Sequence, residues 1–96
     1  MRLIQKTDLF DSWVRGLKDR KARYAIQARL DRVEEGNFGD CKSVGGGVSE
    51  LRIHYGPGYR LYFIERGKTL VILLAGGTKS SQSRDIKRAI EMATFF

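Results

Sequence analysis

The sequence predicts an α+β fold in which an N-terminal helical hairpin packs on a twisted, mainly antiparallel four- to five-stranded sheet, with a C-terminal helix alongside. Apolar residues recur at helical spacing up to about residue 35 and then alternate with polar residues at the two-residue period of strands. Glycine-rich turns of hairpin length separate the strand-like runs. With 96 residues, the chain is expected to form a single domain over residues 1–96. The sheet face opposite the hairpin is expected to stay partly open.

A short strand at about residues 2–6 is followed by two helices. Thr7 is the expected N-cap of the first helix, and Asp19 is that of the second, which is expected to run to about Glu35. Apolar residues at helical spacing set the buried faces of the two helices: Phe10, Trp13, Val14 and Leu17, then Ala22, Ile26, Leu30 and Val33. Basic residues off the second stripe are expected to form a solvated surface: Arg20, Lys21, Arg23, Arg29 and Arg32.

Four strands and a final helix are expected after the hairpin. The strands are expected at about residues 40–44, 48–55, 59–65 and 69–75. Residues 70–74 are apolar at every position, which is typical of a central strand covered on both faces. The final helix is expected from about Ser81, with apolar residues in helical register at Ile86, Ala89, Ile90 and Ala93.

The strands at 48–55 and 59–65 are expected to present a basic, aromatic face to solvent. Glu50, Arg52 and His54 alternate with the apolar residues of the first strand, and Arg60 and Tyr62 alternate with those of the second. Antiparallel neighbours lie ~5 Å apart, so the two polar rows should lie side by side. Such a surface is suited to binding phosphates and bases.

Charge and composition narrow the class of protein further. Eighteen Lys and Arg against eleven Asp and Glu give a net charge of +7, which is typical of nucleic-acid-binding proteins. One cysteine, Cys41, excludes an internal disulfide and leaves no metal-binding cluster, so no metal or other cofactor is expected. The longest apolar run is far shorter than the ~20 residues of a membrane span. We therefore expect a soluble, cytoplasmic protein with no membrane partner.

Several ordered motifs are similar to those of a known family: Lys21-Ala22-Arg23, Arg29-Leu30, Gly36–Asp40, Val48–Ile53, Gly56–Phe63 and Leu73–Gln82 with Asp85-Ile86. Together they resemble the HigB-like addiction-module killer proteins of the RelE/ParE toxin superfamily. The resemblance implies the toxin of a bacterial type II toxin–antitoxin system, with a cognate antitoxin protein as partner. RelE-type relatives cleave mRNA on the ribosome, whereas ParE-type relatives poison DNA gyrase. A gyrase inhibitor and an inactive antitoxin-binding module therefore remain the alternatives to an endoribonuclease.

Metal-independent RNA cleavage uses the 2′-hydroxyl of the substrate as nucleophile, so the protein must move protons and stabilise charge on the phosphate. The residue types suited to these tasks give four candidate catalytic residues: Arg52, Arg60, Lys79 and His54. Four further residues are candidates for RNA binding, the first by stacking on a base: Tyr62, Lys42, Gln82 and Arg84.

Two points of this interpretation stay open. His54 can equally be an ordinary surface residue, and its pairing with Cys41 as a thiol nucleophile is disfavoured because no orienting third group is evident. The chain ends Ala93-Thr94-Phe95-Phe96 and lacks the histidine or tyrosine that contributes near the C-terminus of several HigB and YoeB relatives. The general acid is therefore unassigned.

Overall fold

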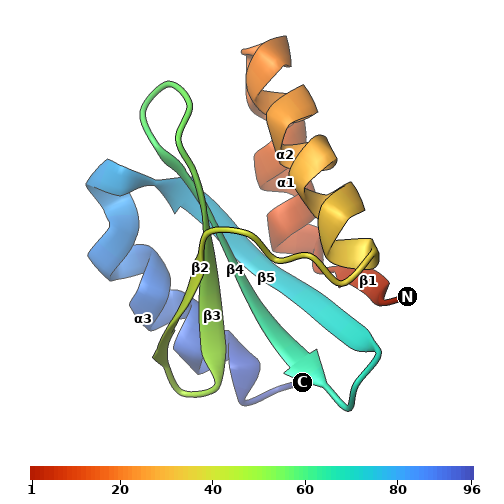
Figure 1. Ribbon diagram of the computed structural model, residues 1–96. Coiled ribbons are helices and arrows are strands. Elements are labelled where there is room, and N and C mark those ends of the chain that lie inside the picture. Colours follow the sequence, from red (N-terminus) through yellow and green to blue (C-terminus); the bar gives the residue numbers. More distant parts are fainter.

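A computed structural model describes residues 1–96 as a five-stranded sheet with helices on both faces (Figure 1). The strands, in their order across the sheet, are β1 (Leu3–Lys6), β5 (Leu70–Thr78), β4 (Tyr59–Arg66), β3 (Val48–Ile53) and β2 (Cys41–Gly45). β1 runs parallel to β5, and every other pair is antiparallel. The helices are α1 (Asp8–Arg15), α2 (Arg20–Glu34) and α3 (Gln82–Ala93), the last preceded by a short 3₁₀ turn, η1 (Lys79–Ser81). The predicted α+β class is confirmed.

Both predicted N-caps of the helical hairpin are confirmed. Thr7 Oγ1 accepts a hydrogen bond from the Phe10 amide at 3.1 Å and donates to the Leu74 carbonyl at 2.8 Å, so it fixes α1 against β5. Asp19 Oδ1 accepts from the Lys21 amide at 2.9 Å at the start of α2. Each cap satisfies a backbone amide that the helix itself cannot pair.

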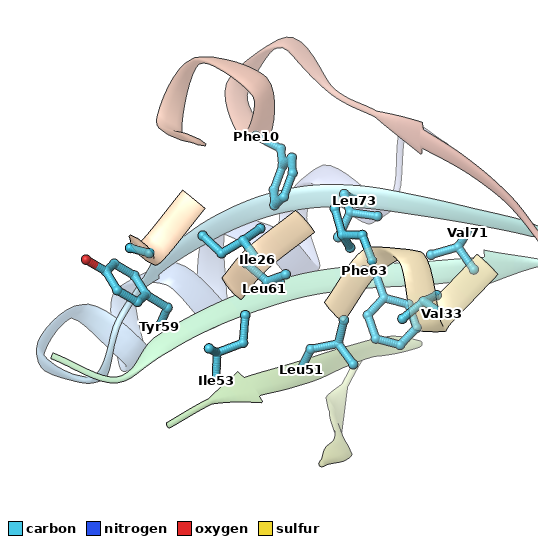
Figure 2. Close-up of a cluster of buried hydrophobic side chains, with 12 residues drawn as sticks. Phe10, Ile26, Val33, Leu51, Ile53, Tyr59, Leu61, Phe63, Val71 and Leu73 are labelled. Carbon is cyan, nitrogen blue, oxygen red and sulfur yellow. The ribbon is translucent and has the colours of Figure 1, made fainter. Parts of the chain in front are cut away.

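The larger core lies between the sheet and the helical hairpin (Figure 2). The apolar residues predicted on this face of β3 and β4 are buried there, and they meet the predicted stripes of α1 and α2. The labelled side chains include Phe10, Ile26, Val33, Leu51, Ile53, Leu61 and Phe63. Tyr59 joins this core, and Tyr55 packs against it while its hydroxyl donates to Asp19 at 2.9 Å.

On the opposite face of the sheet, α3 covers Glu50, Arg60 and Tyr62, so the prediction of a wet face is wrong for these residues. Arg52 and His54, at the end of the same face, remain accessible to solvent. A second core lies under this helix: Val48, Tyr62, Ile64, Ile72, Leu74, Ala75, Ala89 and Ala93. Tyr62 and Glu50 are both 0% exposed, and Arg60 is 9% exposed. The alternation of side chains along the strands is as predicted, but the small apolar residues of α3 let the helix lie directly on the polar row.

β5 is central and buried on both faces, as predicted, and it runs three residues further than expected, to Thr78. Its last residues include two glycines that let helices approach from both sides. A Cβ at Gly76 would collide with the ring of Trp13 in α1, and a Cβ at Gly77 would collide with the Asp85 carboxylate in α3. None of the helices is both long and apolar enough to cross a membrane.

We expect Gly77→Ala to destabilise the fold by about 1–3 kcal/mol, because the added methyl group must displace Asp85 and the first turn of α3. Gly16→Ala is the matched control, since Gly16 has a helical φ of −77° and a Cβ there would meet only backbone atoms. Urea unfolding followed by the fluorescence of Trp13, the one tryptophan, measures both variants. Equal midpoints for the two variants would contradict close packing of α3 on β5.

Candidate functional site

The strand register places the two predicted arginines side by side. Arg52 in β3 pairs with Arg60 in β4, which in turn pairs with Gly77 in β5. Lys79 follows the end of β5, and its amide donates to the Gly58 carbonyl at 2.8 Å, so the lysine lies against the loop between β3 and β4. These three candidate catalytic residues therefore belong to one end of the sheet, where His54, the fourth, directly follows β3. The charges of Arg52 and Arg60 are balanced by the carboxylates of Asp40 and Glu50, whereas Lys79 is exposed and forms no ion pair within the protein.

Arg60 is fixed along one edge of its guanidinium and free of protein acceptors along the other. Its Nη1 donates to Glu50 Oε1 at 3.2 Å, and Glu50 Oε2 accepts from Gln82 Nε2 at 2.9 Å. The Nε of Arg60 is buried without a hydrogen-bond partner, and Nη2 makes no hydrogen bond within the protein. Because Nε is buried, a phosphate would reach this pair of donors and bind through two hydrogen bonds only after the side chains that cover Nε move aside.

Two residues predicted to bind RNA are instead part of this buried network. The side-chain amide of Gln82 donates a hydrogen bond to Glu50. The ring of Tyr62 lies under α3, where it cannot stack on a base while the helix is in place. Burial, together with the charge of Glu50, raises the pKa of Tyr62, so its hydroxyl stays protonated. That hydroxyl is itself buried without a hydrogen-bond partner. The expected exposure of Tyr62 is wrong because the C-terminal helix covers it.

Asp40 joins Arg52 to His54 at the edge of this site. Its Oδ1 accepts from Arg52 Nη2 at 2.8 Å and from Nε at 3.2 Å, and its Oδ2 lies 2.6 Å from His54 Nε2. The hydrogen bonds of His54 and Arg52 hold the pKa of Asp40 below its usual value, so the carboxyl group is ionised at neutral pH. His54 is otherwise exposed, with 76% of its side chain open to solvent.

Sequence reasoning missed Asp40, although a usable signal was present. Asp40 immediately precedes β2, and Cys41 pairs with Leu51 in β3, so Asp40 comes next to Arg52 in the antiparallel register. The Arg52 amide donates to the Asp40 carbonyl at 3.0 Å, which continues this pairing. The predicted strand at residues 40–44 already included Asp40, so the antiparallel register alone would have brought the carboxylate to the arginine.

Arg29 corrects the prediction that every basic residue of α2 is solvated. Only 8% of it is exposed, and it donates to three backbone carbonyls: Arg52 at 2.7 Å, Asp40 at 2.8 Å and Phe38 at 3.0 Å. Burial lowers the pKa of Arg29, but a guanidinium remains charged in proteins. Arg29 thus ties α2 to the backbone beneath Asp40 and Arg52.

The remaining candidates lie outside the cluster. Lys42 is exposed on the edge strand β2, opposite Glu50, and Arg84 is exposed in the first turn of α3. Cys41 packs against the core under the helical hairpin, on the sheet face opposite His54, and burial raises its pKa. The structure therefore does not assemble a cysteine–histidine nucleophile. No three His, Cys, Asp or Glu side chains are grouped so that they could hold a metal ion.

These features define a small basic α+β domain with two neighbouring sheet arginines, one of them beside an aspartate–histidine pair. The chain matches the family described as "Phage derived protein Gp49-like (DUF891)" over residues 12–94, and it belongs to that family. The family is associated with RelE-like toxin activity. The chain is also 52% identical over 86 residues to a protein of Haemophilus influenzae that is described as uncharacterized. That alignment covers 90% of this chain and 87% of the relative.

Proposed function

We propose that the protein is the toxin of a bacterial type II toxin–antitoxin system and that it cleaves mRNA as a metal-independent endoribonuclease. The observation that carries the proposal is the pairing of Arg52 with Arg60 on one sheet face, beside the Asp40–His54 pair. Membership of a family associated with RelE-like toxins supports it. We also propose that the protein is HigB-like within the RelE/ParE toxins, because its sequence motifs resemble those of HigB-like proteins.

The proposed reaction is an attack of the 2′-hydroxyl of RNA on its own adjacent phosphorus. His54 takes the proton of the hydroxyl, the 2′-oxygen bonds to phosphorus, and the bond from phosphorus to the 5′-oxygen breaks. The leaving 5′-oxygen takes a proton from water, and His54 returns its proton to the hydroxide that remains. Arg52, Arg60 and Lys79 stabilise the negative charge that accumulates on the phosphate oxygens. The products are a 2′,3′-cyclic phosphate and a 5′-hydroxyl end.

We further propose mRNA on the ribosome as the substrate and a cognate antitoxin as the protein partner. The net charge of +7 favours docking on ribosomal RNA, and Lys79, which is exposed, adds positive charge at the end of the sheet that carries the two arginines. An antitoxin with an acidic segment would complement the same surface. Binding of that segment over the arginine pair would block RNA and so neutralise the toxin.

Primer extension on cellular mRNA after brief induction tests the function. Wild type is expected to create new RNA ends. Arg52→Ala should reduce them about 10- to 100-fold, because a charged hydrogen bond to the phosphate contributes about 1.5–3 kcal/mol. Lys68→Ala is the control. The substitution also removes one positive charge, but Lys68 lies in the β4–β5 turn at the far end of the sheet. The three proteins are compared at equal abundance.

Growth arrest by wild type without new RNA ends would overturn the ribonuclease proposal. Accumulation of cleaved DNA–gyrase complexes would then identify a ParE-type gyrase inhibitor. If wild type leaves growth unaffected, an inactive antitoxin-binding module becomes the better description. Equal loss of RNA ends in Arg52→Ala and Lys68→Ala would contradict the placement of the site at Arg52.

A further inference from the structure

We propose that Asp40 is a positioning residue that holds the His54 imidazole with its hydrogen on Nε2, so that Nδ1 is the nitrogen that accepts the proton from RNA. The inference rests on the proposed function for its catalytic meaning. Its structural content, the orientation and tautomer of His54, can be tested without RNA. Asp40 is not among the site residues predicted from the sequence.

Asp40 is held through both its side chain and its backbone carbonyl. Its side chain binds Arg52 through Oδ1 and His54 through Oδ2 at 2.6 Å. Its backbone carbonyl accepts from the Arg52 amide at 3.0 Å and from Arg29 Nη2 at 2.8 Å. Arg29 also binds the Phe38 carbonyl, so the chain that leads into Asp40 is anchored to α2. Asp40 thus reaches His54 from a rigid support.

The protonation of Asp40 determines which nitrogen of His54 can act. An ionised carboxylate can only accept hydrogen bonds, so the ring nitrogen that faces it must carry a hydrogen. Because Arg52 and His54 lower the pKa of Asp40, the carboxylate is ionised at neutral pH. Nε2 therefore keeps its hydrogen, and Nδ1, which makes no hydrogen bond within the protein, is the nitrogen whose lone pair is free to accept a proton.

The Asp40 carboxylate also fixes the proposed base, His54, relative to Arg52, one of the arginines proposed to bind the phosphate. Oδ1 orients Arg52, whose strand partner is Arg60, while Oδ2 orients the imidazole. A phosphate bound by the arginines would then have the proton acceptor at a fixed position relative to it. Fixing a reacting group in this way raises the rate by removing unproductive orientations.

Nitrogen NMR of the imidazole tests the positioning directly, because His54 is the one histidine of the chain and needs no assignment. The spectra are recorded with neutral imidazole. Wild type is expected to show one ring nitrogen fully protonated at Nε2 and the other unprotonated at Nδ1. In Asp40→Ala the two signals should move toward each other, since a free imidazole populates both tautomers. Asp31→Ala is the control, because it removes an exposed carboxylate on α2.

Cleavage rates test the catalytic meaning in an Arg52→Ala background, where the contribution of Asp40 through Arg52 is already lost. In this background, His54→Ala is expected to lower the cleavage rate roughly 100-fold or more. Asp40→Ala is expected to lower it about tenfold, because the base remains but is no longer held in position. When His54 is also replaced by alanine, Asp40→Ala should cause no further loss.

Each result decides the inference. Nitrogen signals that are unchanged in Asp40→Ala, or a wild type protonated at Nδ1, would overturn it. A tautomer change with no change in cleavage would overturn the catalytic part alone. If no variant and not even wild type cleaves RNA, the proposed function fails, while the NMR result still shows whether Asp40 orients His54.

Discussion

Replacing Arg60 with alanine is expected to lower the free energy of unfolding by about 3–5 kcal/mol, because it leaves the Glu50 carboxylate buried without its counter-charge. Glu50 is 0% exposed, and the Arg60 side chain is 10% exposed, so solvent screens their interaction little. Gln82 would remain as a neutral donor to Glu50, and it cannot replace the charge. Urea unfolding followed by circular dichroism measures the loss.

A double substitution separates this structural effect from the proposed catalytic one. Glu50→Gln/Arg60→Met removes both charges at similar volume, and we expect it to regain stability to within about 1–2 kcal/mol of wild type. Cleavage should stay about 1,000-fold below wild type, because methionine cannot bind a phosphate. Cleavage that returns together with stability would show that Arg60 serves the fold alone. Stability that remains as low as in Arg60→Ala would contradict the buried pair as its cause.

Side-chain alternation along strands and helix-capping residues predicted most of the fold. Alternation along residues 48–55 and 59–65 placed Leu51 and Phe63 in the core and Arg52 beside Arg60, as the register confirms. Thr7 and Asp19 predicted the helix starts because a cap depends on only a few neighbouring residues. These features are encoded within short segments, so one sequence is enough to find them.

The burial of the second sheet face could not be predicted in the same way. Alternation shows that Glu50, Arg60 and Tyr62 share a face, but not whether a distant helix covers that face. Ala89 and Ala93 are equally compatible with a helix beside the sheet and with one on it. The buried charges of Glu50 and Arg60 become acceptable only when they meet, and that meeting depends on the tertiary structure.

We expect Arg29→Ala to lower the free energy of unfolding by about 3–5 kcal/mol, because three carbonyl groups lose a charged donor at once. The hydrogen bonds that are lost all belong to the segment that supports the site. Gly39 packs directly on the guanidinium: its φ is +65°, and a Cβ there would lie 3.0 Å from Nε and Nη2 of Arg29. Without Arg29, the backbone at residues 38–40 loses both its hydrogen bonds and this contact.

Arg32→Ala provides the comparison, since Arg32 is an exposed arginine one turn further along α2 and makes no side-chain hydrogen bond. It should change stability by less than about 0.5 kcal/mol. Hydrogen exchange adds a residue-level measurement: the Arg52 amide, which donates to the Asp40 carbonyl, should lose protection in Arg29→Ala and keep it in Arg32→Ala. Retained protection of Arg52 in both variants would show that Asp40 is held without Arg29, and the support for the His54 pair would then have to come from β3 alone.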